Sequence, residues 1–187
     1  FRMIERYSRE EMSGIWSEES RYQRWLEIEI LACEARAANG MMPVDAAQRI
    51  RKNATFDVPK IMEVEARTRH DVIAFVTVVG ESIGDDACYF HEGLTSSDIL
   101  DTCLATQLRD SGKLLLEDLE ALKVTIKNLA LKHKKTLCIG RTHGIHGEPT
   151  TFGLKCAVWY QDVLRAVKRL RFAMDEISVG KLSGAVG

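Results

Sequence analysis

The sequence lacks the features that mark β-rich, membrane-spanning or disulfide-linked proteins. Prolines number only three in 187 residues and aromatic residues make up 7%, whereas Ala, Leu, Glu and Lys are frequent, a composition that favours helices over strands. No apolar run approaches the roughly 20 residues that span a bilayer, and residues 1–11 lack the apolar core of a signal peptide. We therefore expect a soluble helical chain that does not enter a membrane.

Charge and cysteine content exclude further classes of protein. The 26 basic residues stand against 27 acidic ones, a formal net charge of −1, so there is no broad electrostatic basis for binding nucleic acid or a membrane surface. The five cysteines are an odd number, widely spaced and without a CxxC pair. This pattern indicates neither a disulfide framework nor a zinc site, and it fits the reducing cytoplasm, where we place the protein.

Helix start and stop signals predict several helices, the longest of them in the second half of the chain. Residues 8–11 (SREE) and 95–98 (TSSD) have the form of capping boxes, and Asp57 precedes Val58-Pro59 as an N-cap does. The β-branched residues from 72 to 79 are apolar on all sides and lack flanking turns, so they favour a buried helix over a strand. The predicted helices lie at about 20–39, 43–51, 58–68, 72–79, 95–133 and 149–177.

Helices longer than 25 residues that are joined by short loops indicate an elongated bundle. We predict an all-α fold, with an N-terminal helical domain at residues 1–92 and the first long helices of a central bundle at residues 93–187. The glycine-punctuated segment 140–148 is predicted as a loop between the last two helices. Bundles of this kind usually have oligomeric partners along their sides.

The histidines suggest where chemistry could take place. Four of the five lie at predicted helix junctions, beside hydroxyls or arginines. The TSSD helix start could bind a carboxylate or phosphate, although such a tetrapeptide is more often only a cap. His143 and His146 have the i,i+3 spacing of some metal sites, but nothing nearby completes a ligand set, so we expect no metal. Histidine acid–base chemistry on an anionic substrate remains, beside a purely structural role for each histidine.

Five segments carry a resemblance to a known family. MIERYSREEMSGIW, TRHDVIAFV, HEGLTSSDILDT, GRTHGIHGEPTTFGLK and GKLSGAVG resemble, in this order, the N-terminal blocks of adenylosuccinate lyase, within the fumarase/aspartase superfamily. The resemblance extends from Met3 to Gly187. It implies two β-eliminations that release fumarate. One converts adenylosuccinate to AMP, and the other acts on the succinylated aminoimidazole carboxamide ribotide of purine biosynthesis.

The resemblance also implies roles for individual residues, without any cofactor. His143 matches the general acid that protonates the leaving nitrogen, and His70 matches a second histidine close to the reacting centre. Arg6 and Tyr7 match a phosphate-binding pair, whereas Thr95 and Ser96 match hydroxyls that bind the succinyl group. The full set of expected substrate-binding residues is Arg6, Tyr7, Arg69, Asp71, His91, Thr95, Ser96 and Thr142.

Two departures from the family pattern limit these expectations. The resembling enzymes use a serine base on a mobile loop that this chain lacks, and Gly147 stands where they have Ala. They form homotetramers whose active sites combine three subunits, so we expect the chain alone to be inactive. His146 is expected to be scaffold and Lys181 receives no role. Another superfamily lyase, such as argininosuccinate lyase or fumarase, and a non-catalytic helical interaction module remain as alternatives.

Overall fold

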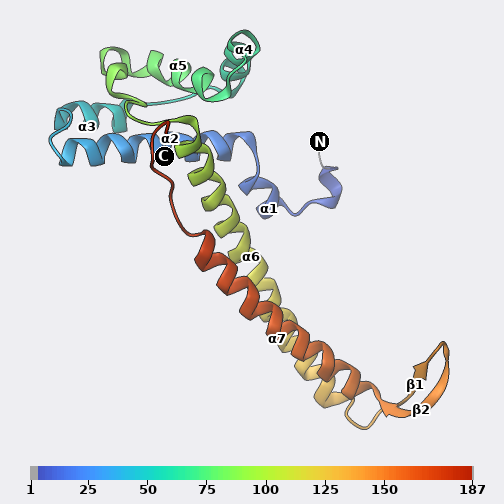
Figure 1. Ribbon diagram of the computed structural model, residues 1–187. Coiled ribbons are helices and arrows are strands. Elements are labelled where there is room, and N and C mark those ends of the chain that lie inside the picture. The colour runs from blue at the N-terminus through green and yellow to red at the C-terminus, as the bar shows by residue number, and fades with distance from the viewer. Residues whose placement is uncertain (1–3, 187) are drawn as a thin grey trace. The chain divides into compact units, whose positions relative to one another are not determined.

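The computed structural model describes residues 4–186, so Met3 and Gly187, at the two ends of the resemblance, lie outside the described residues (Figure 1). The chain is mostly helical, which confirms the predicted fold class. In chain order its elements are the 3-10 helix η1 (Glu5–Tyr7), α1 (Glu10–Ile15), α2 (Glu18–Ala38), α3 (Val44–Asn53), α4 (Val58–Thr68), α5 (Asp71–Ile83), the 3-10 helix η2 (Gly84–Tyr89), α6 (Ser96–Lys132), β1 (Leu137–Thr142), β2 (Ile145–Thr151) and α7 (Phe152–Ile177).

The chain divides into two compact units. The first comprises the residues up to Gln107 together with the segment from Val179, and the second comprises Leu108–Ser178. Helix α6 is continuous over 37 residues, close to the predicted range 95–133, and contributes to both units. The domain boundary expected at residue 92 stays a prediction. Among the helices of residues 4–186, none is both long and apolar enough to cross a membrane.

An aromatic cluster between α2 and α5 forms the core of the first unit. The rings of Tyr22 and Phe75 are stacked with centroids 5.9 Å apart, and Trp25 meets both edge-on at 5.1 and 5.4 Å. Such pairs add about 0.5–1.5 kcal/mol each beyond the burial of their area. Helix α5 buries Val72, Val79 and other apolar residues around this cluster. The segment was correctly predicted as a buried helix, despite its β-branched residues.

The predicted helix starts are only partly correct. Asp57 caps α4 by accepting a hydrogen bond from the Lys60 N–H at 2.8 Å, as expected. The capping box at residues 8–11 was wrong: α1 begins at Glu10 with Arg9 as its N-cap, and the Ser8 hydroxyl donates instead to the Ile4 carbonyl at 3.5 Å. A local sequence match to a capping box does not ensure that the serine adopts the capping position.

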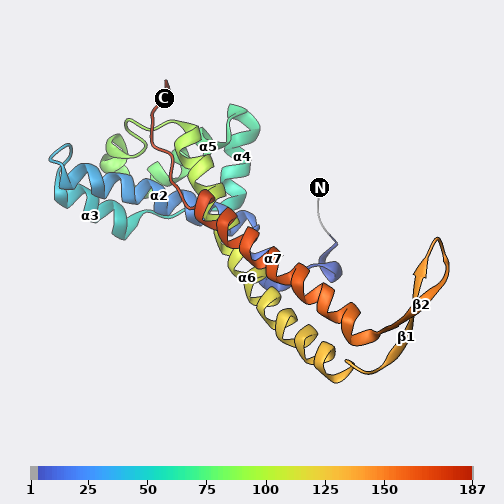
Figure 2. The same ribbon diagram turned by 60° about the horizontal axis from the view of Figure 1, so that its bottom comes forward.

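The second unit is an antiparallel pair of helices joined by a β-hairpin. Both views show α7 running back beside the second-unit part of α6 (Figures 1 and 2). Ile126 of α6 and Cys156, Val163 and Val167 of α7 are buried in their contact. This core is small, and apolar side chains on both helices, such as Leu122 and Phe172, are exposed.

The predicted loop at 140–148 is a β-hairpin instead. Strands β1 and β2 pair antiparallel, with Thr142 opposite Ile145 and a register shift between Ile139 and Arg141. His143 and Gly144 form the two-residue turn, with φ of +51° and +75°, the left-handed geometry of a type I′ turn. The hairpin was missed because its strands are mostly exposed and show no apolar alternation. The next helix therefore begins at Phe152 instead of residue 149, capped by Thr151.

Gly153 in the first turn of α7 has no room for a side chain. A Cβ there would lie 2.6 Å from the Ala130 carbonyl oxygen and from the Lys134 backbone. We expect Gly153→Ala to lower the free energy of unfolding by about 1–3 kcal/mol through overpacking. Gly147→Ala is the matched control, because its Cβ would meet the nearest atom, the Gly140 carbonyl oxygen, at 3.4 Å. Denaturant unfolding checks both, and equal stability of the two variants would contradict the packing argument.

Candidate functional site

A cavity of about 340 Å³ lies between α5, the loop before α6 and the first turn of α6. Four of the residues singled out from the sequence line it, namely His70, His91, Thr95 and Ser96. An apolar wall is formed by Val72, Ile73, Val76 and Leu94, and Thr77 contributes a further hydroxyl. The first unit thus brings together parts of two sequence blocks, TRHD and HEGLTSSD.

His70 reaches the cavity as the N-cap of α5. Its Nδ1 accepts a hydrogen bond from the Ile73 N–H at 3.2 Å, which satisfies one of the unpaired donors of the first helical turn. A nitrogen that accepts cannot carry the proton of a neutral imidazole, so this contact assigns the proton to Nε2. His70 therefore offers a hydrogen-bond donor through its other nitrogen.

A buried carboxylate gives His91 the opposite tautomer to that of His70. Its Nδ1 lies 2.5 Å from Oε1 of Glu29, whose side chain is 0% exposed. The carboxylate oxygen accepts, so Nδ1 carries the proton, and in the neutral imidazole Nε2 is then an acceptor. The two histidines of the cavity thus differ in tautomer: His70 can donate where His91 can accept.

The first turn of α6 is fastened by Asp98, which is 1% exposed. Its Oδ2 accepts from the backbone N–H groups of Thr95 at 2.9 Å and Gly184 at 3.1 Å. Its Oδ1 accepts from the Ser183 N–H at 2.9 Å and from Nζ of Lys181 at 3.0 Å. One of the two interactions of the predicted capping box is therefore present, in which the Asp98 carboxylate accepts from the Thr95 N–H. The segment that follows α7 is bound to the same carboxylate.

These donors change the acidity of Asp98. Burial alone raises the pKa of a carboxyl group, but the N–H groups of Ser183, Thr95 and Gly184 and the ammonium of Lys181 outweigh it and hold the pKa of Asp98 well below its ordinary 3.8. The carboxylate is therefore charged at neutral pH although it is buried. It anchors the helix end that presents Thr95 and Ser96 to the cavity.

Backbone strain also falls on the residues singled out from the sequence. Within residues 4–186, the non-glycine residues with positive φ are Arg69 at 55°, His91 at 62° and His143 at 51°. Left-handed backbone is disfavoured for residues other than glycine, although Asn, Asp and His tolerate it better than most. Such strain tends to gather at functional sites. Each of the three belongs to a different one of the blocks TRHD, HEGLTSSD and GRTHG.

Other predicted residues of the first unit lie away from this cavity lining. Arg69 borders a separate hollow on α4 beside Met62 and Glu65. The Asp71 carboxylate accepts from the Val72 N–H at 2.8 Å. Arg6 and Tyr7 are exposed in η1, where the guanidinium donates to the Tyr7 hydroxyl at 3.1 Å and lies 4.8 Å from the ring centroid.

Thr142 and His143 belong to the second unit. Thr142 ends β1, and His143 occupies the exposed tip of the hairpin. His146 lies opposite Arg141 in the pairing, with Nε2 3.5 Å from the arginine Nη2. The hairpin therefore presents His143 on a tight turn, where its ring is accessible.

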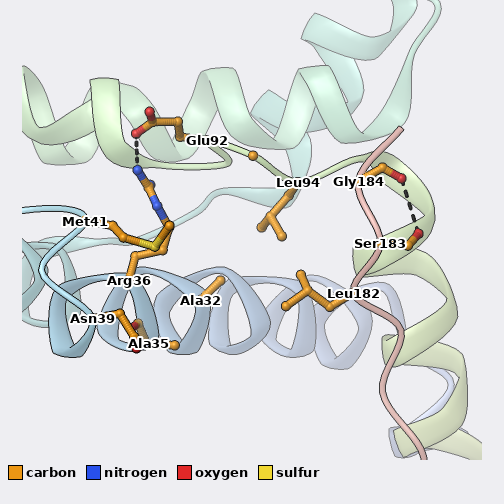
Figure 3. A pocket seen from close by; sticks show the side chains of 11 residues that line it. Ala32, Ala35, Arg36, Asn39, Met41, Glu92, Leu94, Leu182, Ser183 and Gly184 are labelled. Atoms are coloured by element: carbon orange, nitrogen blue, oxygen red, sulfur yellow. Dashed lines mark hydrogen bonds and ion pairs between the residues drawn. The ribbon is translucent and has the colours of Figure 1, made fainter. Parts of the chain in front are cut away.

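A second, larger cavity of about 460 Å³ lies beside α2 (Figure 3). Arg36 at its edge is paired with Glu92 and also donates to the Tyr89 carbonyl at 3.0 Å. The rest of the lining is mainly aliphatic or small, and includes Leu94 and Leu182, which face each other across the opening in Figure 3. None of the predicted site residues lines this cavity.

Comparison with known proteins shows the family. A family profile described as "Lyase" matches residues 5–187. The chain belongs to this lyase family. An adenylosuccinate lyase of Bacillus subtilis (strain 168) is 52% identical over 185 residues, which cover 99% of this chain and 43% of that protein. An adenylosuccinate lyase of Staphylococcus saprophyticus is 48% identical with the same coverage. The resemblance to that family is confirmed.

Solved structures agree with this assignment at the level of fold. The crystal structure of a fumarate lyase from Mesorhizobium sp. BNC1 superposes with a TM-score of 0.91 and 29% sequence identity, over 97% of this lyase-family chain and 44% of the other. A 3-carboxy-cis,cis-muconate lactonizing enzyme from Pseudomonas putida gives a TM-score of 0.87 at 31% identity, over 94% and 42%. The chain spans less than half of the length of the relatives it matches.

Two residues at the site, Glu29 and Lys181, were not given a role from the sequence. Glu29 lies within an apolar helix, with Trp25 and Cys33 one turn before and after it, so its place on the buried face was readable. A buried acid requires a partner, but the sequence did not indicate that the partner of Glu29 is His91. Lys181 was noticed without a role, and the structure pairs it with Asp98.

The Asp98 contacts predict a sensitivity to acid. Because the pKa of Asp98 is lower in the folded chain than in the unfolded one, its stabilisation is complete above 3.8 and is lost as pH falls below that value. We expect Asp98→Asn to lower the free energy of unfolding by roughly 3–5 kcal/mol at pH 7, since Lys181 loses its carboxylate partner and the amide group meets N–H donors. The cost should shrink below pH 3.8. Denaturant unfolding at several pH values measures it, with exposed Asp101→Asn as control; a pH-independent cost would contradict the argument.

Proposed function

We propose that this chain is the N-terminal portion of a longer adenylosuccinate lyase of purine biosynthesis. The reaction is β-elimination of fumarate from adenylosuccinate, giving AMP, and from the succinylated aminoimidazole carboxamide ribotide. About 50% identity to adenylosuccinate lyases over nearly the whole chain supports this choice within the lyase family. The share of those enzymes that is matched, 43%, supports the view that further segments complete the site.

The single observation that carries the proposal is the cavity lined by His70, His91, Thr95 and Ser96. Removing a proton beside a carboxylate creates a state with additional negative charge, which needs hydrogen-bond donors or positive charge around it. The N-terminus of α6 supplies the positive end of a helix dipole, and the two hydroxyls supply neutral donors. Thr95 and Ser96 are therefore proposed to bind the succinyl carboxylates.

His143 is proposed as the general acid that protonates the departing nitrogen. A histidine has an ordinary pKa near pH 7, which suits a group that must both hold and release a proton. Its exposed position on the hairpin turn leaves the ring free to meet a substrate. His70 is proposed as the second catalytic histidine, through its Nε2–H. Arg6, Tyr7, Arg69, Asp71, His91 and Thr142 complete the proposed substrate-binding set.

The base is proposed to come from a serine loop outside this chain. The family resemblance implies a homotetramer whose active sites combine segments of three subunits. The exposed apolar side chains of α6 and α7, such as Leu122 and Phe172, suit contacts with further bundle helices.

The chain alone is expected to release no fumarate from adenylosuccinate, because the base and the neighbouring subunits are missing. The measurement is the change in ultraviolet absorbance as adenylosuccinate is consumed, with the full-length enzyme as the positive control. Turnover by the purified 187-residue chain would show that the site is complete without further segments.

In the full-length enzyme, we expect His143→Ala to lower kcat by about 100-fold or more with a modest change in KM, since general acid catalysis contributes about 10²–10⁴-fold. Ala also disfavours the left-handed backbone at φ +51°, so His143→Asn, which tolerates this conformation, separates the acid from the turn. His146→Ala in the same hairpin is the control and should retain kcat. Near wild-type kcat for both His143 variants would rule out the general-acid role.

Tests with different substrates and replacements of the histidines distinguish two alternatives from this proposal. Another lyase of the superfamily would turn over argininosuccinate or hydrate fumarate, so the full-length enzyme is tested against adenylosuccinate, argininosuccinate and fumarate. A non-catalytic helical interaction module would bind its partner regardless of changes at His70, His91 and His143. The lyase proposal requires that activity fall when these histidines are replaced.

A further inference from the structure

We propose that Glu29 is a positioning residue for this reaction, which fixes His91 with its proton on Nδ1 and its acceptor nitrogen, Nε2, available to the cavity. The inference deepens the proposed function and rests on it for the reaction, but the contact itself belongs to the described chain. Glu29 and His91 are 62 residues apart in sequence and meet at 2.5 Å between Oε1 and Nδ1.

Burial of the Glu29 side chain has an unfavourable desolvation free energy. Its side chain is 0% exposed, on the face of α2 that also buries Trp25 and Cys33. The surroundings are poorly solvated: burial raises the pKa of the Cys33 thiol to about 11, with the charge of Glu29 as the next cause. A carboxylate in such surroundings loses its hydration, and a single partner does not fully replace it.

Only half of the carboxylate is compensated. Oε1 has His91, whereas Oε2 is buried and has no hydrogen-bond partner within residues 4–186. An apolar residue of similar volume often stabilises a protein as well as a buried carboxylate that is only partly compensated, or better. The carboxylate at this position is therefore explained by the orientation of His91 and not by a gain in the stability of the fold.

His91 is constrained at its backbone as well as at its ring. Its φ of 62° places the residue in the left-handed region, and its side chain is 23% exposed. Because Nδ1 is engaged by Glu29, Nε2 is the ring nitrogen left for the cavity, whose lining includes His91. A carboxylate that accepts from one imidazole nitrogen and thereby sets the chemistry of the other is a recurring arrangement in enzymes.

The consequence for the cavity is a complementary pair of histidines. The Nδ1 of His70 accepts from the Ile73 N–H, so its Nε2 donates, whereas Nε2 of His91 accepts. A substrate that presents both a hydrogen-bond acceptor and an N–H or O–H donor would satisfy both rings. Without Glu29 the ring of His91 is free to exchange tautomers, and this pattern is lost.

The test uses the full-length enzyme with Glu29→Met, which keeps similar volume and removes the acceptor, and Glu29→Gln, which retains a neutral acceptor. We expect Glu29→Met to lower kcat/KM at least tenfold and Glu29→Gln to lose less. The melting temperature of each should stay within ~4 °C of wild type. Glu34→Gln is the matched control, because Glu34 is on the same helix, has a side chain that is 41% exposed and pairs with Arg51.

A second measurement reads the tautomer directly. Nuclear magnetic resonance of the full-length enzyme labelled with ¹⁵N-histidine should show the proton of His91 on Nδ1 in the wild type and on Nε2, or on both nitrogens in exchange, in Glu29→Met. Unchanged kcat/KM in both Glu29 variants, or a wild-type His91 protonated on Nε2 alone, would overturn the proposal. If the wild-type enzyme releases no fumarate, the proposed function fails, while the tautomer of His91 still decides whether Glu29 orients it.

Discussion

The carboxylate of Asp98 is the contact that holds the start of α6 and residues 181–184 together within the first unit. It accepts four hydrogen bonds from donors in two segments, the start of α6 and residues 181–184, although it is almost fully buried. Thr102 adds a reciprocal pair of hydrogen bonds with the backbone of Lys181. Residues 181–184, which belong to the first unit, are thereby bound to the start of α6, and the helix end that presents Thr95 and Ser96 is fixed.

What could be predicted from sequence was mainly local. Caps such as Asp57, the buried helix α5 and the length of α6 follow from patterns within a few turns of chain, and each was correct. The hairpin was not predicted, because its signal is a His-Gly turn rather than the Asn-Gly or Asp-Gly pair that usually marks a type I′ turn. The His-Gly signal is visible once His is recognised as tolerant of left-handed backbone.

The polar contacts of the site could not be predicted, for a different reason. Glu29 and His91 are 62 residues apart, and Asp98 and Lys181 are 83 apart. Burial of an acid can be deduced from helical periodicity, but its partner depends on how the helices pack. The cavity histidines were named from sequence, whereas their tautomers required the hydrogen bonds to Ile73 and Glu29. Residues that line the cavity could thus be named from sequence, but the roles of Glu29 and Lys181 and the tautomers of the histidines could not.

The type I′ turn at His143 has a consequence for which residues this position could accept during evolution. Its backbone must adopt φ of +51°, so β-branched side chains are excluded and only a few residue types fit without strain. Of the types that tolerate this conformation, histidine alone ordinarily titrates near neutral pH. The side chain at position 143 must therefore fit the positive φ of the turn and, in the proposed role, also transfer a proton near neutral pH. Replacement of His143 by a residue outside this small set, such as lysine or tyrosine, would first require a different turn.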